Sequence, residues 1–460
     1  MATKAMTRSP GHRCSECGWL AVKWVGRCGE CQAWGTVSEI GAVRVKTTAA
    51  VVVDRPAIRI GEVDAHQAEA RSTGVSEFDR VLGGGLVRGA VVLVAGEPGI
   101  GKSTLLLDVA ARAARQNQSV LYISGEESAA QIRMRAERIE AMAKNLFLAA
   151  ETDLATVLGQ IGQVHPDLVV IDSVQTIASG EVEGSAGNVS QIREVAASLI
   201  QLAKNQGISI LLVGHVTKDG SIAGPRVLEH LVDVVIQFEG DRHSRLRLVR
   251  AVKNRYGPTD EVGCFDLSDV GIVGLPDPSG LFLSSRDLIV PGTCVSVTLE
   301  GRRPLVTEVQ ALLAVTTAPS PRRTTSGLDS SRVAMILAVL DKRAKVPVRQ
   351  ADCYVSTVGG VKVSEPAADL AIALAMASSV SDRALPPGTV ALGEVGLAGE
   401  IRAVTGIPRR LAEAARLGFR QAVVPAGSLG SDPTPVGMEV LEVSDIRQVV
   451  SLVMPVLAAQ

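Results

Sequence analysis

The residues with the clearest chemical meaning form an eight-residue pattern at 96–103, in which a glycine and four further residues precede Gly-Lys-Ser. This is the phosphate-binding P-loop spacing, in which backbone N–H groups and the positive end of a helix dipole face phosphates. The lysine supplies a mobile cation, and the hydroxyl of Ser103 is suited to ligate magnesium. The residues we assign to the nucleotide are Gly96, Glu97, Pro98, Gly99, Ile100, Gly101, Lys102, Ser103 and Thr104.

The segments around this loop are those that a P-loop requires. Residues 91–95 are a short apolar run that predicts a buried strand, and residues 103–115 favour a helix. The alternative, a glycine-rich turn with a solvated lysine, is disfavoured because strand, loop and helix occur in the correct order.

Carboxylates follow apolar strands where a nucleotide site needs them. Asp172 ends the run at 168–171, the Walker B arrangement, and is suited to hold magnesium through its water shell; its alternative role is a helix cap. Glu126 follows the run at 121–123 and is our choice for the base that deprotonates the attacking water, although a solvated first-turn glutamate is the alternative. His215 follows a further apolar run and is either close to the γ-phosphate or only structural.

Four of the seven cysteines form two CxxC pairs, Cys14 with Cys17 and Cys28 with Cys31. Each pair can chelate from a tight turn, so the spacing predicts one tetrahedral zinc ion. Four thiolates leave no open position, which indicates a structural site. Two disulfides, or a redox CxxC beside an idle pair, are the alternatives, and a cytosolic chain disfavours both.

Basic and aromatic residues alternate around these cysteines. All three tryptophans of the chain, Trp19, Trp24 and Trp34, lie here, together with Arg13, Lys23 and Arg27. Such residues are able to stack on bases and contact a nucleic-acid backbone. The alternative is that the tryptophans form the core of a small zinc module, and the sequence does not decide between the two.

A second basic region extends from Arg242 to Pro258. In an extended strand, one face carries Arg245, Arg247, Lys253 and Arg255, and the other carries Leu246, Leu248 and Val252. This stripe would serve DNA phosphates or a neighbouring subunit's nucleotide, or would simply be solvated. The glycine-rich loop at 217–226 is expected to be a channel-lining loop.

The composition describes an ordinary globular protein of two or three domains. The chain has 460 residues, 21% charged residues and a formal net charge of -1, so nucleic-acid binding would have to come from local patches. No apolar run approaches the ~20 residues that span a bilayer, and the first residues lack a signal-peptide core. We therefore expect a cytoplasmic protein without membrane contact.

Strand-like and helix-like segments alternate from residue 72 to 275, which predicts a parallel sheet covered on both faces. A second α/β unit without a P-loop follows, with a Pro/Arg/Thr/Ser-rich break at 318–327. The expected domains are a zinc finger at 10–38, a linker at 39–71, an ATPase domain at 72–275 and a C-terminal domain at 285–460.

Taken together, these motifs resemble the RadA (Sms) family of bacterial DNA repair proteins. The resemblance rests on the four-cysteine knuckle, the P-loop core and Lys253-Asn254-Arg255-Tyr256-Gly257, which is similar to that family's Lys-Asn-Arg-Phe-Gly signature. It implies an α/β fold with a RecA-like P-loop ATPase core, an N-terminal zinc knuckle and a C-terminal Lon-protease-like domain.

The resemblance also implies the activity. It implies a homohexameric ring that uses ATP, Mg²⁺ and Zn²⁺, binds single-stranded and branched DNA, and promotes branch migration alongside RecA. The implied catalytic residues are Lys102, Glu126, Asp172, His215, Lys253 and Arg255, with the last two serving DNA and a neighbour's ATP site.

The C-terminal domain resembles the proteolytic domain of Lon, but its catalytic residues are missing. Ala367 stands at the serine position and Pro408 at the lysine position, so no acyl-enzyme can form. We expect a scaffold, with Arg302, Arg303, Arg322 and Arg323 as a possible DNA platform. The competing functions are a RecA-like signalling or scaffold ATPase and, less favoured, a Lon-type protease.

Overall fold

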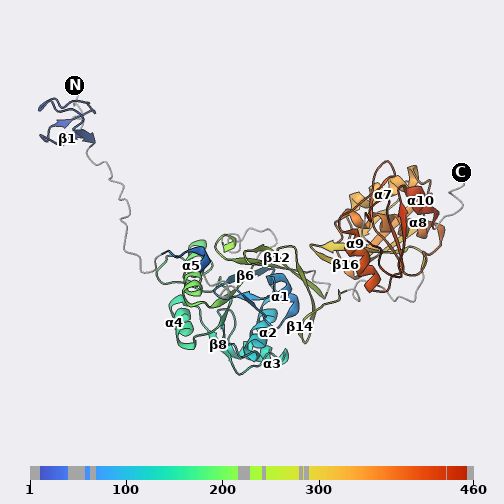
Figure 1. The fold of residues 1–460 in the computed structure, drawn as a ribbon, viewed down its shortest axis with the longest axis horizontal. Coiled ribbons are helices and arrows are strands. Elements are labelled where there is room, and N and C mark those ends of the chain that lie inside the picture. Colours follow the sequence, from blue (N-terminus) through green and yellow to red (C-terminus); the bar gives the residue numbers. More distant parts are fainter. Residues whose placement is uncertain are drawn as a thin grey trace. The chain divides into compact units, whose positions relative to one another are not determined.

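The computed structural model divides the chain into two compact units, Met1–Asp64 and Ala65–Gln460 (Figure 1). It describes residues 11–39, 57–62, 69–215, 228–240, 245–278, 283, 290–430 and 433–452. The predicted channel loop at 217–226 and residues 242–244 of the basic region lie outside the described residues.

The first unit contains a small antiparallel sheet with the strand order β2-β1-β3. Its strands are β1 (His12–Cys14), β2 (Leu20–Ala21) and β3 (Val37–Glu39). A short 3-10 helix, η1 (Ile60–Glu62), follows later in this unit. The small core consists of Cys14, Cys28 and Val37, with Trp19 packed against it.

The second unit begins with a nine-stranded sheet in the order β14-β13-β12-β11-β6-β10-β9-β7-β8. Strands β11, β6, β10, β9, β7 and β8 are parallel, and β12, β13 and β14 continue the sheet in antiparallel fashion. In chain order the strands are β6 (Val91–Gly96), β7 (Val120–Ser124), β8 (Leu146–Ala150), β9 (Leu168–Asp172), β10 (Ser209–His215), β11 (Val234–Glu239), β12 (Leu246–Asn254), β13 (Val262–Ser268) and β14 (Gly271–Gly274).

Helices cover both faces of this sheet, as the alternating pattern predicts, and several are labelled around β6 and β8 in Figure 1. Helices α1, α2 and α3 pack on one face against Val92 and Val94, and α4 and α5 pack on the other against Val91 and Leu93. Adjacent residues of one strand thus enter opposite cores. The helices are α1 (Ser76–Leu82), α2 (Lys102–Arg115), α3 (Ala129–Arg138), α4 (Leu154–Val164) and α5 (Val189–Gln206).

The C-terminal part contains a seven-stranded sheet in the order β17-β18-β16-β15-β19-β22-β23. Helices α7, α8 and α10 contribute to one core, and α9 contributes to the other. The strands are β15 (Thr293–Glu300), β16 (Arg303–Val315), β17 (Arg323–Ser326), β18 (Ala351–Thr357), β19 (Thr389–Ala391), β22 (Gln421–Pro425) and β23 (Glu439–Val443). The helices are α7 (Ser330–Lys342), α8 (Asp369–Ser381), α9 (Ile407–Arg416) and α10 (Ile446–Ser451).

The break expected at 318–327 is wrong in part. Strand β17 lies within it and pairs in parallel with β18, so main-chain pairing overrides a composition that is typical of a loop. The smaller elements are the strand pairs β4 (Ala70–Arg71) with β5 (Leu86–Val87) and β20 (Glu394–Val395) with β21 (Ile401–Arg402), and the 3-10 helices η4 (Val358–Gly360) and η5 (Pro366–Ala368). Within the described residues, no helix combines the length and apolar character needed to traverse a bilayer.

Candidate nucleotide site and metal centre

The P-loop connects the carboxyl end of β6 to the first turn of α2. Gly99 and Gly101 have φ angles of 77° and 112°, in the region that favours glycine, so both glycines are needed for this turn. Ser103 and Thr104 are half-buried in the first turn of α2, where backbone N–H groups have no intrahelical partner. The loop therefore has the backbone conformation and the helix terminus that suit a phosphate.

Lys102 is almost fully buried and is held by the loop itself. Its Nζ donates to the carbonyl oxygens of Gly96 at 2.8 Å and Glu97 at 2.9 Å, and it lies 3.3 Å from Nδ1 of His215. Burial lowers the pKa of Lys102 to about 8, although the carboxylates of Asp172 and Glu126 act in the opposite direction. A buried cation held by two carbonyl oxygens and an imidazole nitrogen, none of them an anion, is well placed to accept an anionic ligand.

Glu126 joins the same cluster from the segment after β7. Its Oε1 accepts a hydrogen bond from Ser173 Oγ at 2.6 Å and lies 2.9 Å from Nε2 of His215. Burial alone would raise the pKa of Glu126, but these two partners outweigh burial and lower it. The carboxyl group is therefore ionised near neutral pH, as a proton acceptor must be.

Asp172 ends β9 beside Lys102, and one of its oxygens is held by a residue that the sequence analysis missed. Tyr122 Oη donates to Asp172 Oδ2 at 2.6 Å, whereas Oδ1 is buried without a hydrogen-bond partner among the described residues. A buried carboxylate oxygen left unpaired fits a cation or its bound water. Tyr122 lies in an apolar strand, so only its hydroxyl distinguishes it from a core residue in the sequence.

The structure thus brings together Lys102, Glu126, Asp172 and His215 at the carboxyl edge of the parallel strands. It does not bring Lys253 and Arg255 to this edge. Lys253 Nζ donates to the carbonyls of Glu229 and Val232, and Arg255 Nη1 donates to Asp233 Oδ1 at 3.1 Å. Asp233 precedes β11 and also accepts from the N–H of Val91, so these residues lie at the amino edge of the sheet.

The expectation of one continuous basic stripe on β12 is wrong. The pairing of β11 with β12 shifts between Val235 and Ile236, so Val252 is an extra residue that bulges out of the strand. The bulge reverses the alternation of side chains, and Val252 becomes exposed instead of sharing a buried face. Arg247 is buried and donates to Ile100 O of the P-loop, while Arg245 pairs with Asp266.

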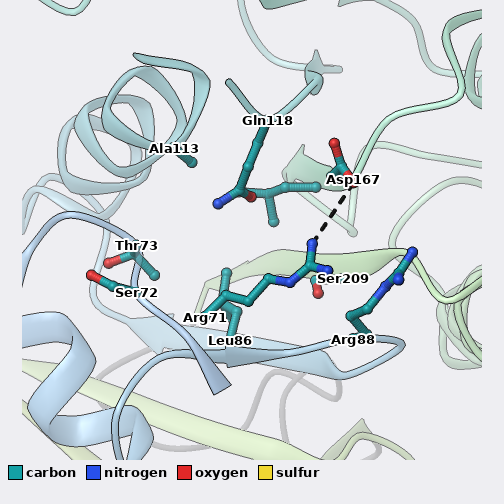
Figure 2. A pocket seen from close by; sticks show the side chains of 10 residues that line it. Arg71, Ser72, Thr73, Leu86, Arg88, Ala113, Gln118, Asp167 and Ser209 are labelled. Carbon is teal, nitrogen blue, oxygen red and sulfur yellow. Dashed lines mark ion pairs between the residues drawn. The ribbon is translucent and has the colours of Figure 1, made fainter. Parts of the chain in front are cut away.

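A separate pocket lies at the amino edge of the same sheet. Figure 2 shows Arg71 and Arg88 beside it, with Arg71 forming an ion pair of 4.0 Å with Asp167. Its other lining residues include Ser209, whose hydroxyl donates to Val87 O. None of the residues that line this pocket belongs to the P-loop cluster, so we do not assign it to the nucleotide.

The four cysteines form one cluster, with their Sγ atoms all within 4.8 Å of one another. The Sγ atoms of Cys14 and Cys31 are 3.7 Å apart, and those of Cys17 and Cys28 are 3.5 Å apart. Tetrahedral zinc with Zn–S bonds of ~2.3 Å requires about 3.8 Å between sulfurs, whereas a disulfide requires about 2 Å. The cluster fits Zn²⁺.

The C-terminal domain has no protease machinery at the expected positions. Ala367 is buried in η5, and Pro408 lies in the first turn of α9. Close by, the buried Arg410 forms a bidentate pair with Glu365, with distances of 2.6 and 2.8 Å. An ion pair thus occupies this region, and neither member is a nucleophile suited to acyl transfer.

The prediction that Arg303 belongs to a DNA-binding platform is wrong. It is 7% exposed and pairs with Glu77 of α1, and it also donates to the carbonyls of Val262, Leu275 and Pro276. Arg302 forms an exposed pair with Asp260. The residues that remain in the proposed DNA platform are Arg302, Arg322 and Arg323.

Three segments of the chain match known family models. Residues 57–221 match a model described as an AAA domain, and residues 12–39 match one described as a rubredoxin metal binding domain. Residues 330–428 match a model described as subunit ChlI of Mg-chelatase. These matches confirm an N-terminal metal-binding module, an AAA-type ATPase domain and a third α/β domain, and so confirm the predicted fold class.

Relatives are similar to the chain over nearly its whole length. A protein of Mycolicibacterium smegmatis is 54% identical and covers 95% of this chain and 96% of its own. Proteins of Streptococcus pyogenes and Halalkalibacterium halodurans are 46% and 44% identical, each over at least 94% of both chains. All three are named DNA repair protein RadA. The chain belongs to the RadA family of DNA repair proteins.

Proposed function

We propose that the protein is a DNA-dependent ATPase of recombinational DNA repair. In this proposal it binds single-stranded and branched DNA and promotes branch migration of recombination intermediates together with RecA. It works in the cytoplasm as a homohexameric ring. The ATPase proposal rests on one observation: His215 contacts both Lys102 of the P-loop and Glu126, and Asp172 lies near Lys102.

Each residue of this cluster has a role that its contacts support. Lys102 exchanges the carbonyls of Gly96 and Glu97 for phosphate oxygens, which are stronger partners for a buried cation. Glu126 accepts the proton of the attacking water through Oε2, since Ser173 and His215 hold Oε1. Ser103 and Asp172 would hold Mg²⁺, which when bound neutralises charge that develops on the phosphates.

His215 is suited to sense the nucleotide because it lies between Lys102 and Glu126. Its two ring nitrogens are 3.3 Å from Lys102 Nζ and 2.9 Å from Glu126 Oε1. A movement of Lys102 toward phosphate would therefore change the hydrogen bonds of Glu126. His215 is also the last residue of β10.

The position of Arg255 supports an ATP site shared between subunits. Arg255 lies at the amino edge of the sheet and the P-loop at the carboxyl edge, about 17 Å away for a six-residue strand. An arginine side chain does not span that distance, so Arg255 cannot reach the phosphates in its own chain. We propose that Lys253 and Arg255 serve the nucleotide of a neighbour or DNA, as a ring with heterologous interfaces allows.

Turnover of ATP by the Lys102→Ala variant, with and without single-stranded DNA, tests the ATPase proposal. We expect a loss of at least about 100-fold, because the lysine supplies charge where the transition state develops it. Lys144→Ala is the matched control, since Lys144 is exposed and should be dispensable. Wild-type turnover in Lys102→Ala would refute the assignment.

Filter binding to single-stranded DNA across a salt series tests the DNA proposal separately. A DNA motor should bind with an affinity that falls steeply as salt rises, because bound cations are released from the phosphates. Negligible binding with and without ATP analogues would instead favour a signalling or scaffold ATPase.

A further inference from the structure

The zinc module carries two exposed indole rings that its own core does not use. The small core holds only Cys14, Cys28 and Val37, with Trp19 packed against it. A β-carbon on Gly29 would lie 2.9 Å from the ring of Trp19, so the half-buried ring packs directly against Gly29. By contrast, Trp24 is 64% exposed and Trp34 is 75% exposed. The structural role considered for all three tryptophans therefore applies to Trp19 alone.

Trp24 and Trp34 border one another on the module surface. Atoms of both rings lie 3.7 Å from the position that a β-carbon of Gly26 would occupy. The backbone holds the segment of Trp34 beside that of Gly26, because Arg27 and Trp34 form an antiparallel bridge and the N–H of Gly35 donates to Gly26 O at 2.8 Å. Two indole rings thus lie near one another on the surface without filling a hydrophobic core.

The same surface is cationic. The guanidinium of Arg27 lies over the ring of Trp34, 5.8 Å from its centroid, and its Nε donates to Gln32 O. Lys23, the residue before Trp24 in the chain, is also exposed. Neither Lys23 nor Arg27 has a carboxylate partner within the part of the chain that the structure describes. Unpaired cations beside exposed aromatic rings favour a partner that offers both flat rings and negative charge.

We propose that Lys23, Trp24, Arg27 and Trp34 form a binding surface for single-stranded nucleic acid, on which bases stack on the two indoles and the cations contact phosphates. The identity of the strand as DNA rests on the proposed function. Stacking needs no particular base, because every base has a π-face, so the surface would bind without sequence preference.

Intrinsic fluorescence of the full-length protein tests this surface directly. The three tryptophans of the chain all lie in the zinc module, so tryptophan emission reports on this module alone. Titration with oligothymidylate should quench that emission in parallel with the rise in anisotropy of a labelled oligonucleotide. High salt should reverse both signals.

Variants separate the surface from the rest of the protein. We expect Trp24→Ala/Trp34→Ala to weaken binding of oligothymidylate by about tenfold or more, and Trp24→Phe/Trp34→Phe to retain most of the affinity, because phenylalanine still stacks. Phe147→Ala removes an exposed aromatic residue outside the module and should bind like the wild type. A zinc content of about one ion per chain shows that each variant has folded.

The outcomes also distinguish this proposal from the proposed function. If the protein binds DNA with unchanged tryptophan emission, and the double alanine variant binds like the wild type, the surface serves another partner and the proposal is overturned, while the DNA-dependent ATPase stands. If the wild type binds no oligonucleotide at all, both proposals fail. Quenching together with weakened binding by the double alanine variant supports the surface.

Discussion

At the scale of single residues, the site depends on a tyrosine that no motif identifies. Tyr122 is 1% exposed, and its hydroxyl donates a hydrogen bond to Asp172 Oδ2. The other oxygen of this carboxylate, Oδ1, has no partner among the described residues. Burial and the neighbouring Asp172 raise the pKa of Tyr122 well above its usual value, so the phenol stays protonated and donates. Tyr122 therefore fixes the orientation of the carboxylate that we assign to magnesium.

Tyr122→Phe removes only this hydrogen bond. A hydrogen bond to a charged group contributes ~1.5–3 kcal/mol, so we expect the Mg²⁺ concentration for half-saturation to rise by about ten- to a hundredfold. The measurement is the binding of a fluorescent ADP analogue as a function of Mg²⁺, with ATP turnover at saturating Mg²⁺ expected to stay close to wild type.

Tyr354→Phe is the matched control, because it removes a hydroxyl from the C-terminal domain without touching the cluster. A Tyr122→Phe protein that melts at a lower temperature but keeps wild-type Mg²⁺ dependence would show that the tyrosine is only structural.

At the scale of elements, a buried ion pair between Arg303 and Glu77 links the start of β16 to α1. Glu77 is 1% exposed and accepts from Arg303 and from the N–H of Cys264. Arg303 in turn donates to the three carbonyls of Val262, Leu275 and Pro276. Glu77 also pairs with the half-exposed Arg80 at 3.4 Å, but Arg303 is its buried counter-charge, so removing Arg303 would leave the buried carboxylate poorly compensated.

Arg303→Met tests this arrangement. We expect the variant to lose up to about 3–5 kcal/mol of unfolding free energy, because Glu77 would stay buried with only the half-exposed Arg80, 3.4 Å away, as its counter-charge. Arg302→Ala is the neighbouring control, since its pair with Asp260 is exposed and should contribute less than about 1 kcal/mol. Urea unfolding followed by circular dichroism measures both. Equal effects for the two variants would contradict the assigned role of burial.

At the scale of the whole molecule, the separation of Arg255 from the P-loop predicts complementation between subunits. Lys102→Ala and Arg255→Ala proteins should each be inactive, but their mixture should recover about a quarter of wild-type turnover, since one in four random interfaces joins an intact P-loop to an intact arginine. ATP hydrolysis after mixing and reassembly measures this recovery.

The control is the double variant Lys102→Ala/Arg255→Ala, which should rescue neither single variant, because every interface then lacks one of the two groups. An inactive mixture of the single variants, despite proven co-assembly of differently tagged subunits, would show that Arg255 does not complete a neighbour's site.

The sequence by itself determined the local features of this protein. These features are the P-loop spacing, the two CxxC pairs and the alternation of strands and helices. Each depends on residues close together in the chain, so each can be recognised from the sequence alone. For the same reason the helix at 103–115 and the strands before Glu126 and Asp172 are found almost where they were predicted.

Only the tertiary structure decided which groups meet. The hydroxyl of Tyr122 on Asp172, the burial of Arg303 against Glu77, and the bulge at Val252 that divides the basic strand all depend on strand register and on packing between distant segments. The same holds for the tryptophans. Composition treats Trp19, Trp24 and Trp34 alike, whereas the space left around the four cysteines admits one ring and leaves the other two exposed.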